Sequence, residues 1–154
     1  MRNKRIIITI ILPWTLVILW MGLIFFFSHQ PATESSELST GITEVIVDVV
    51  NVIAPDNDFM FNQGVINFSI RKAAHFGVYL VLGLLVFNGL IHSSIPRSKA
   101  IILALLICVL YAISDEFHQL YVPGRSGQVS DVLLDSSGAL MGILLMNAVR
   151  RVRR

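Results

Sequence analysis

Four long apolar runs constrain this chain more than any other feature of its sequence. They occupy residues 6–27, 70–91, 100–121 and 129–149, and each reaches the roughly 20 apolar residues that a helix needs to cross a bilayer. The chain of 154 residues is 55% hydrophobic and only 14% charged, whereas soluble domains carry about a quarter charged residues. We therefore predict an all-α membrane protein, a four-transmembrane-helix bundle that forms one domain over residues 1–154.

The first run could also be a signal peptide, because Arg2, Lys4 and Arg5 precede it. The apolar core of a signal peptide has only about 7 to 15 residues and ends at a small-residue cleavage site. This run is longer and ends in three phenylalanines at 25–27. We interpret it as a retained membrane anchor.

The distribution of Lys and Arg predicts how the spans are oriented. With the N-terminus inside, nine of the twelve Lys and Arg residues fall on the inner side, and the outer side keeps Arg71, Lys72 and Arg125. The first loop, 28–69, carries six acidic residues and no Lys or Arg. Because cytoplasmic loops are enriched in Lys and Arg, we expect a multi-pass plasma-membrane protein with both termini in the cytoplasm.

The long first loop contains a helical pattern of its own. Its apolar residues recur at helical spacing, with the acidic residues elsewhere: Ile42, Val45, Ile46, Val49 and Ile53. This predicts a short amphipathic helix in the first extracytoplasmic loop. It could rest on the bilayer interface or cover a site between the spans.

Two features exclude other classes of protein. The net charge of +2 hints at a nucleic-acid partner, but the basic residues cluster at the chain ends and short turns instead of forming one stripe. We expect no nucleic-acid binding. The single cysteine, Cys108, can form neither an intramolecular disulfide nor a thiolate metal knuckle.

Polar residues of the last three runs all fall near the predicted outer face. Successive residues of a helix are about 100° apart around its axis. On this basis the polar residues of the second run lie within an arc of about 100°, those of the third within about 160° and those of the fourth within about 60°. By run, they are Arg71, Lys72, His75 and Tyr79; Tyr111, Asp115, Glu116, His118 and Gln119; and Asp131, Asp135, Gly138 and Gly142. Ionisable groups at such depth normally face the bundle interior or a wet cavity. We predict one outward-facing polar pocket, with the glycines allowing a neighbouring helix to approach closely.

The turn between the third and fourth runs, residues 122–127, contains one proline and two glycines and presents Arg125 at the mouth of this pocket. Three basic residues then stand against four acidic ones, so we expect a nearly self-neutralising cluster. The basic residues are Arg71, Lys72 and Arg125, and the acidic ones are Asp115, Glu116, Asp131 and Asp135. One alternative is that this buried ion network only braces the helices.

The residue types suggest two kinds of chemistry. General acid-base catalysis could use His75, Asp115, Glu116 and His118, with Asp115 paired to His118 or Glu116 opposite His75. A phosphate headgroup could be held by Arg71, Lys72 and Arg125. The remaining candidates for substrate binding are Tyr79, Gln119, Asp131 and Asp135. No GxSxG, HExxH, Walker or kinase motif is present, so catalysis stays open.

A divalent cation is a further possibility, with ligands from His75, His118, Asp115, Glu116, Asp131 and Asp135. The nearby basic residues could neutralise the same acids instead. We therefore assign no metal site from the sequence, and the cofactor stays unknown.

Several of these residues together resemble the VanZ-like family. The pattern comprises Lys72-x-x-His75 with Tyr79, Asp115-Glu116-x-x-Gln119, Pro123-Gly124-Arg125 and Asp131 with the glycines after it, and it extends back to Trp20 and Ser28-x-Gln30-Pro31. The chain departs from the family at Asp135, often asparagine there, and at His29, commonly serine. The resemblance implies a small membrane protein of the bacterial envelope, whose namesake is linked to low-level resistance to the glycopeptide teicoplanin. It implies no agreed reaction.

These observations lead to two functional hypotheses. In the first, the pocket binds, or binds and modifies, an anionic envelope lipid or lipid-linked glycan, such as a cell-wall precursor or a teichoic-acid-type glycolipid, and contributes to glycopeptide resistance or envelope homeostasis. In the second, the chain is a non-catalytic structural or interaction protein. A proton-coupled carrier is disfavoured because the inner half of the spans lacks titratable groups. The oligomeric state stays open.

Overall fold

The computed structural model describes residues 7–53 and 63–152, which form helices joined by short turns and contain no strand. The elements in chain order are the π-helix η1 (Ile7–Ile11) and the α-helices α2 (Leu12–Ser28), α3 (Ala32–Ile53), α4 (Gln63–His92), α5 (Arg97–Gln119) and α6 (Val129–Val152). Pro13, which has no backbone N–H to donate, lies in the first turn of α2, directly after the π-helix η1.

Four of these helices are long and apolar enough to span a membrane, as the sequence predicts. The spans are Thr9–Ser28, Gly64–His92, Arg97–Gln119 and Val129–Val152. Their outer surfaces carry large apolar side chains, with Ile18 and Ile102 both 67% exposed. Such surfaces suit contact with lipid acyl chains.

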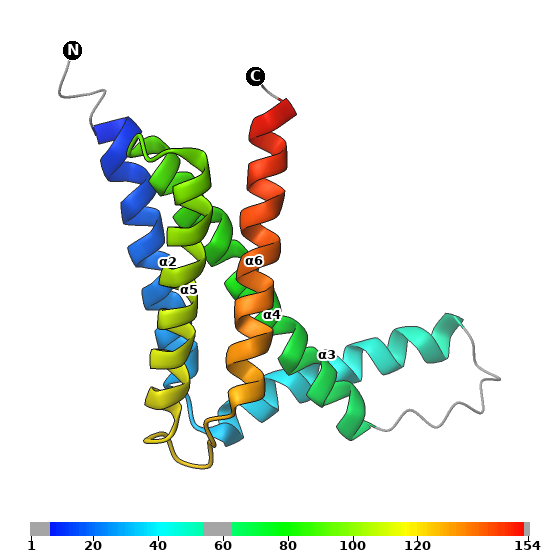
Figure 1. Ribbon diagram of the computed structural model, residues 1–154. Coiled ribbons are helices and arrows are strands. Elements are labelled where there is room, and N and C mark those ends of the chain that lie inside the picture. Colours follow the sequence, from blue (N-terminus) through cyan, green and yellow to red (C-terminus); the bar gives the residue numbers. More distant parts are fainter. Residues whose placement is uncertain (1–6, 54–62, 153–154) are drawn as a thin grey trace.

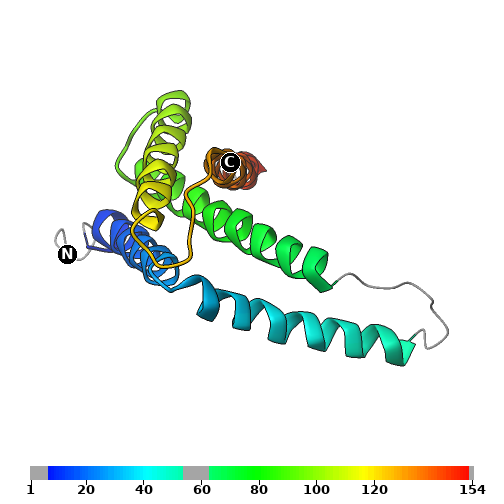
Figure 2. The same cartoon turned by 90° about the horizontal axis from the view of Figure 1, so that it is seen from below.

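The axes of the four spans are not all parallel to one another (Figure 1). Helices α2, α5 and α6 run roughly alongside one another, while α4 crosses behind them at a slant (Figure 1). With 30 residues, α4 is about 45 Å long, and it begins at Gln63, earlier than the apolar run alone predicts. Its N-terminal part leaves the bundle beside α3, as the view from below shows (Figure 2). The first and last described residues lie at the same end of the bundle (Figure 1).

The crossing of α4 and α6 depends on glycine. A Cβ atom at Gly138 would meet the backbone of Phe76, and one at Gly142 would meet the backbone of Leu80. On the facing helix, a Cβ at Gly83 would meet the backbone of Ala139. The predicted close approach at the glycines is confirmed, and α4 is the neighbouring helix.

Small residues also form the inner face of α5. Ala100, Ala104, Cys108 and Ala112 recur every fourth residue and are fully buried. The same face continues to Asp115 and then to Gln119, which are also buried. The stripe that packs α5 into the bundle therefore also carries its polar residues inward.

Among the long-range hydrogen bonds of α2, three have an aromatic side chain as the donor. Trp14 Nε1 donates to Ser93 Oγ at 2.9 Å and Trp20 Nε1 to the Val78 carbonyl at 2.8 Å. The hydroxyl of Tyr111 on α5 donates to the Met21 carbonyl at 2.6 Å. Both tryptophans thus pack α2 against the neighbouring α4 segment.

The helix of the first loop is confirmed but is longer than predicted. It begins at Ala32, where Glu34 in the first turn favours the helix N-terminus, although the first ten residues lack the apolar periodicity. Its polar face is the one that contacts the protein, since Asn67 of α4 hydrogen-bonds to Thr40 and Thr43. The apolar residues Ile42, Val45, Ile46 and Val49 are exposed, with Val45 63% accessible.

Candidate functional site

A cavity of about 500 Å³ opens at the end of the bundle opposite the termini, between α2, α3 and α4. One wall is apolar, built by Leu23, Ile24 and Phe27 of α2 and by Phe68 and Val78 of α4. The N-terminal part of α3 and the turn between α5 and α6 also contribute residues to the lining.

Eight of the residues predicted from the sequence line this cavity, although they come from three helices and a turn. They are Arg71, Lys72, His75, Tyr79, Asp115, Gln119, Arg125 and Asp131. The cavity also contains side chains that were not among the predicted site residues: Ser28, Gln30, Ser35, Ser39, Ser126 and Gln128. Ser28 and Gln30 already belong to the motif at the exit of the first span, a signal that could have found them.

An ion pair joins α4 to α6 at the edge of the cavity. Lys72 Nζ contacts Asp131 Oδ1, and the two side chains are 25% and 15% exposed. Asp131 lies in the first turn of α6, where a carboxylate also interacts favourably with the helix dipole. Lys72 is therefore already engaged by one carboxylate.

Arg125 has a different set of partners from those predicted. Its guanidinium donates to two backbone carbonyls at the end of α2, with Nε 3.0 Å from Gln30 O and an Nη 3.3 Å from Phe27 O. Partial burial lowers the pKa of this guanidinium from its ordinary value, and the nearby Asp115 carboxylate opposes that shift. Arg125 thus caps α2 while it still lines the cavity, and three of its five N–H donors are not used in these bonds.

Glu116 connects α5 to the start of α6. Its Oε2 accepts a hydrogen bond from the backbone N–H of Gln128 at 2.8 Å, immediately before the first residue of α6. A carboxylate at a helix N-terminus satisfies an otherwise unpaired donor and interacts with the dipole. The other oxygen, Oε1, is buried without a hydrogen-bond partner.

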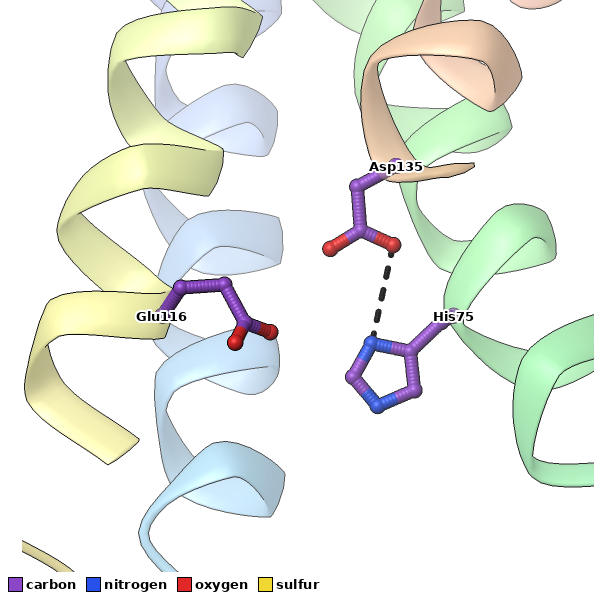
Figure 3. A group of neighbouring side chains, drawn as sticks. All are labelled: His75, Glu116 and Asp135. Carbon is purple, nitrogen blue, oxygen red and sulfur yellow. Dashed lines mark ion pairs between the residues drawn. The ribbon is translucent and has the colours of Figure 1, made fainter. Parts of the chain in front are cut away.

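Behind the cavity wall, His75 meets two carboxylates (Figure 3). Its Nδ1 lies 3.5 Å from Oδ1 of Asp135, and one ligand atom from each of His75, Glu116 and Asp135 lies within 4.8 Å of the others. Asp135 is 0% exposed, and neither of its oxygens has a hydrogen bond. The predicted opposition of Glu116 and His75 is therefore observed.

The sequence suggested that the basic residues of the cluster neutralise its acidic residues. In the part of the chain that the structure describes, most of these acidic residues are not paired with Lys or Arg. Within residues 7–53 and 63–152, the ion pairs are Lys72 with Asp131 and His75 with Asp135. Asp115 has a long contact of 3.5 Å with the amide of Gln119, and its Oδ1 is buried without a partner. Arg71 is exposed, and Arg125 binds carbonyls instead. The structure thus leaves three buried carboxyls without a Lys or Arg partner among the described residues.

His118 lies apart from this group. It contacts His29 across 3.2 Å between ring nitrogens and packs on Phe25 with the ring centroids 4.5 Å apart, and it does not line the cavity. On α5 it lies roughly 60° around the helix axis from Asp115, toward α2. The predicted acid-base pairing of Asp115 with His118 is therefore not formed, because the 160° arc was too wide to meet a single site.

Four apolar spans around a polar cavity at one end define a multi-pass helical membrane protein. The family model described as VanZ/LLP1 matches residues 13–150, which is nearly the whole chain. The chain belongs to the VanZ/LLP1 family, in agreement with the resemblance of its motifs. Neither the curated proteins nor the solved structures that were searched gave a match.

Proposed function

We propose that this protein binds an anionic envelope lipid, or the phosphate-bearing end of a lipid-linked glycan, in the cavity between α2, α3 and α4. One observation carries the proposal: a cavity of about 500 Å³ combines apolar side chains of α2 and α4 with Arg71, Lys72 and Arg125 in its lining. Acyl chains suit the wall, and a phosphate suits guanidinium and ammonium donors. Ligand sites commonly have this composition, mostly apolar with a few convergent polar groups.

Arg71 is the residue on which headgroup binding should depend most. It lines the cavity and is exposed, whereas Lys72 is paired with Asp131 and Arg125 holds the end of α2. A hydrogen bond to a charged group is worth about 1.5–3 kcal/mol, so its loss corresponds to roughly tenfold or more in affinity.

The experiment compares two charge-removing variants of the purified protein. Phosphatidylglycerol binding in detergent is measured by native mass spectrometry, with phosphatidylethanolamine as the zwitterionic comparison. Arg71→Gln should weaken phosphatidylglycerol binding about tenfold. The matched control is Lys99→Gln, an exposed position in the first turn of α5 at the opposite end of the bundle. Equal binding by the two variants would remove the headgroup assignment.

The proposed orientation places the cavity in the extracytoplasmic leaflet. Arg97 and Arg150 lie on helix ends remote from the cavity, and enrichment in Lys and Arg favours the cytoplasmic side. A membrane-impermeant maleimide applied to intact cells should label Ser126→Cys and spare Ser98→Cys. The reverse pattern would place the cavity in the cytoplasmic leaflet.

In the cell, we expect lipid binding to contribute to resistance to teicoplanin-type glycopeptides or to envelope homeostasis. Teicoplanin susceptibility of a sensitive bacterial host expressing the chain should fall, and the Arg71→Gln variant should lose this effect. Turnover of the bound lipid would involve His75 with Glu116 or Asp115, because His118 is too remote from the cavity. Retained protection in Arg71→Gln would separate the phenotype from headgroup binding.

The second candidate is a non-catalytic brace. It is favoured by the contacts that connect elements, namely Lys72 with Asp131 and Glu116 with the N–H of Gln128. A purely bracing network would pair its charges, whereas Asp115 and Asp135 have buried oxygens without partners. Asp115→Asn separates the two functions: a brace predicts loss of stability, and a binding site predicts loss of binding with stability kept.

A further inference from the structure

We infer that His75, Glu116 and Asp135 form a binding site for one divalent transition-metal cation, with Zn²⁺ as the ion that best fits the ligands. The three side chains come from α4, α5 and α6 and point toward one another (Figure 3). Their ligand atoms lie within 4.8 Å of one another. The site adjoins the lipid cavity but is separate from it, since only His75 lines both.

The ligand set is the type that Zn²⁺ uses. One imidazole nitrogen and two carboxylate oxygens give three protein ligands and leave a fourth position open, the arrangement of catalytic zinc sites. Zn²⁺ ligands lie at about 2.0–2.2 Å from the ion, so that neighbouring ligand atoms are roughly 3.5 Å apart. Closing the present separation of up to 4.8 Å requires side-chain shifts of about 1 Å, which rotations of the Glu116 and Asp135 side chains can provide.

The burial of the cluster's carboxylates and their missing hydrogen bonds also point to a cation. Asp135 is completely buried, and both of its oxygens lack a hydrogen bond, as does Oε1 of Glu116. A buried carboxylate is costly unless it is paired or coordinates a metal. No Lys or Arg within the described residues pairs with either side chain, and a protonated His75 would set one positive charge against two negative ones. A divalent cation would balance both carboxylates.

The surroundings also orient the ligands. The Oε2 atom of Glu116 accepts a hydrogen bond from the N–H of Gln128, which fixes the carboxylate and leaves Oε1 without a hydrogen-bond partner. Such outer contacts of a metal ligand hold its geometry and typically affect affinity tenfold to a hundredfold. Gly138, one turn beyond Asp135, lets α6 approach the α4 backbone at Phe76, next to His75. The helix crossing thus places the two ligands together.

The test measures Zn²⁺ alone, without lipid. All proteins carry His118→Ala, so that the contact between His29 and His118 cannot hold an ion. The full-length protein in detergent is stripped with a chelator and titrated with Zn²⁺, and bound Zn²⁺ is determined by elemental analysis. Asp135→Asn is compared with Asp131→Asn, the same substitution one turn earlier on α6 at a residue paired with Lys72. Tryptophan fluorescence reports whether each variant is folded.

We expect one Zn²⁺ per chain, an affinity at least about tenfold lower in Asp135→Asn, and unchanged affinity in Asp131→Asn. His75→Gln, which removes the imidazole but keeps a polar side chain, should show the same loss if Asp135→Asn does not fold. X-ray absorption of the bound ion should show a single imidazole ligand. The assignment is overturned if the His118→Ala chain binds no Zn²⁺, if Asp135→Asn and His75→Gln both keep its affinity, or if Asp131→Asn loses as much. Phosphatidylglycerol binding is measured separately, so either site can fail alone.

Discussion

The glycine contacts between α4 and α6 make a quantitative prediction for Gly138→Ala. A Cβ at Gly138 would meet the backbone of Phe76, with the carbonyl carbon at 3.1 Å and the Cα at 3.2 Å and the oxygen closer still. All three atoms belong to the backbone, so the methyl group fits only if the two helices move apart. The side chains packed along the crossing would then lose contact.

The expected magnitude follows from two opposing effects. Inserting a methylene-sized group into a packed interior costs about 1–3 kcal/mol, while alanine in place of glycine in a helix gains roughly 1 kcal/mol. The net loss for Gly138→Ala therefore lies between about 0 and 2 kcal/mol, and at the upper value the ratio of folded to unfolded protein falls about 30-fold.

The assay is unfolding by sodium dodecyl sulfate in mixed micelles, followed by the fluorescence of Trp14 and Trp20, which both pack between α2 and its neighbours. Gly22→Ala and Gly77→Ala are matched controls, because a Cβ at either position meets nothing within 4 Å. Both should be neutral or stabilising. If Gly138→Ala is as stable as these controls, the α4 and α6 backbones do not touch as described.

Three further predictions test individual contacts. Arg125→Lys should lower the free energy of unfolding by about 1 kcal/mol, because an ammonium group cannot make both bonds of the guanidinium to the end of α2; an unchanged unfolding midpoint would contradict the capping role. A double-mutant cycle of Lys72→Met and Asp131→Asn should give a coupling energy of about 1 kcal/mol for this half-buried pair, and a coupling within error of zero would refute the ion pair. Nitroxide labels on Val45→Cys and Glu44→Cys, in a chain without its native cysteine, should differ in collision rates with oxygen and with a water-soluble nickel chelate. The label at Val45 should favour oxygen if the exposed stripe of α3 lies on the membrane interface, and equal rates would contradict that placement.

The sequence predicted the parts of the fold that follow from hydrophobicity. Runs of about 20 apolar residues were sufficient to locate four spans, and helical spacing located the apolar stripe of α3. Helix ends made of polar residues carry no such signal. For this reason the first ten residues of α3 and the start of α4 at Gln63 were not predicted.

The site was predicted in composition but not in pairing. Helical angles bring residues of three spans to one end, and they correctly oppose His75 to Glu116. Angles do not say which neighbour a side chain reaches, so the bonds of Arg125 to carbonyls and the contact of His118 with His29 emerged only from the structure. The expectation of a nearly neutral cluster failed for the same reason. It came from adding the charges of the residues, and such a sum does not show which charged groups are in contact.

The account rests on the meeting of α4 and α6 side chains behind the cavity, and proximity of His75 to Asp135 tests it most directly. In a Cys108→Ala chain, His75→Cys with Asp135→Cys should react with a short bifunctional thiol reagent within one molecule, leaving no free thiols by mass spectrometry. The comparison pair, His75→Cys with His118→Cys, should keep both thiols, since His118 faces α2. Free thiols in the first pair, or equal reaction in both, would contradict the convergence of these helices on one site.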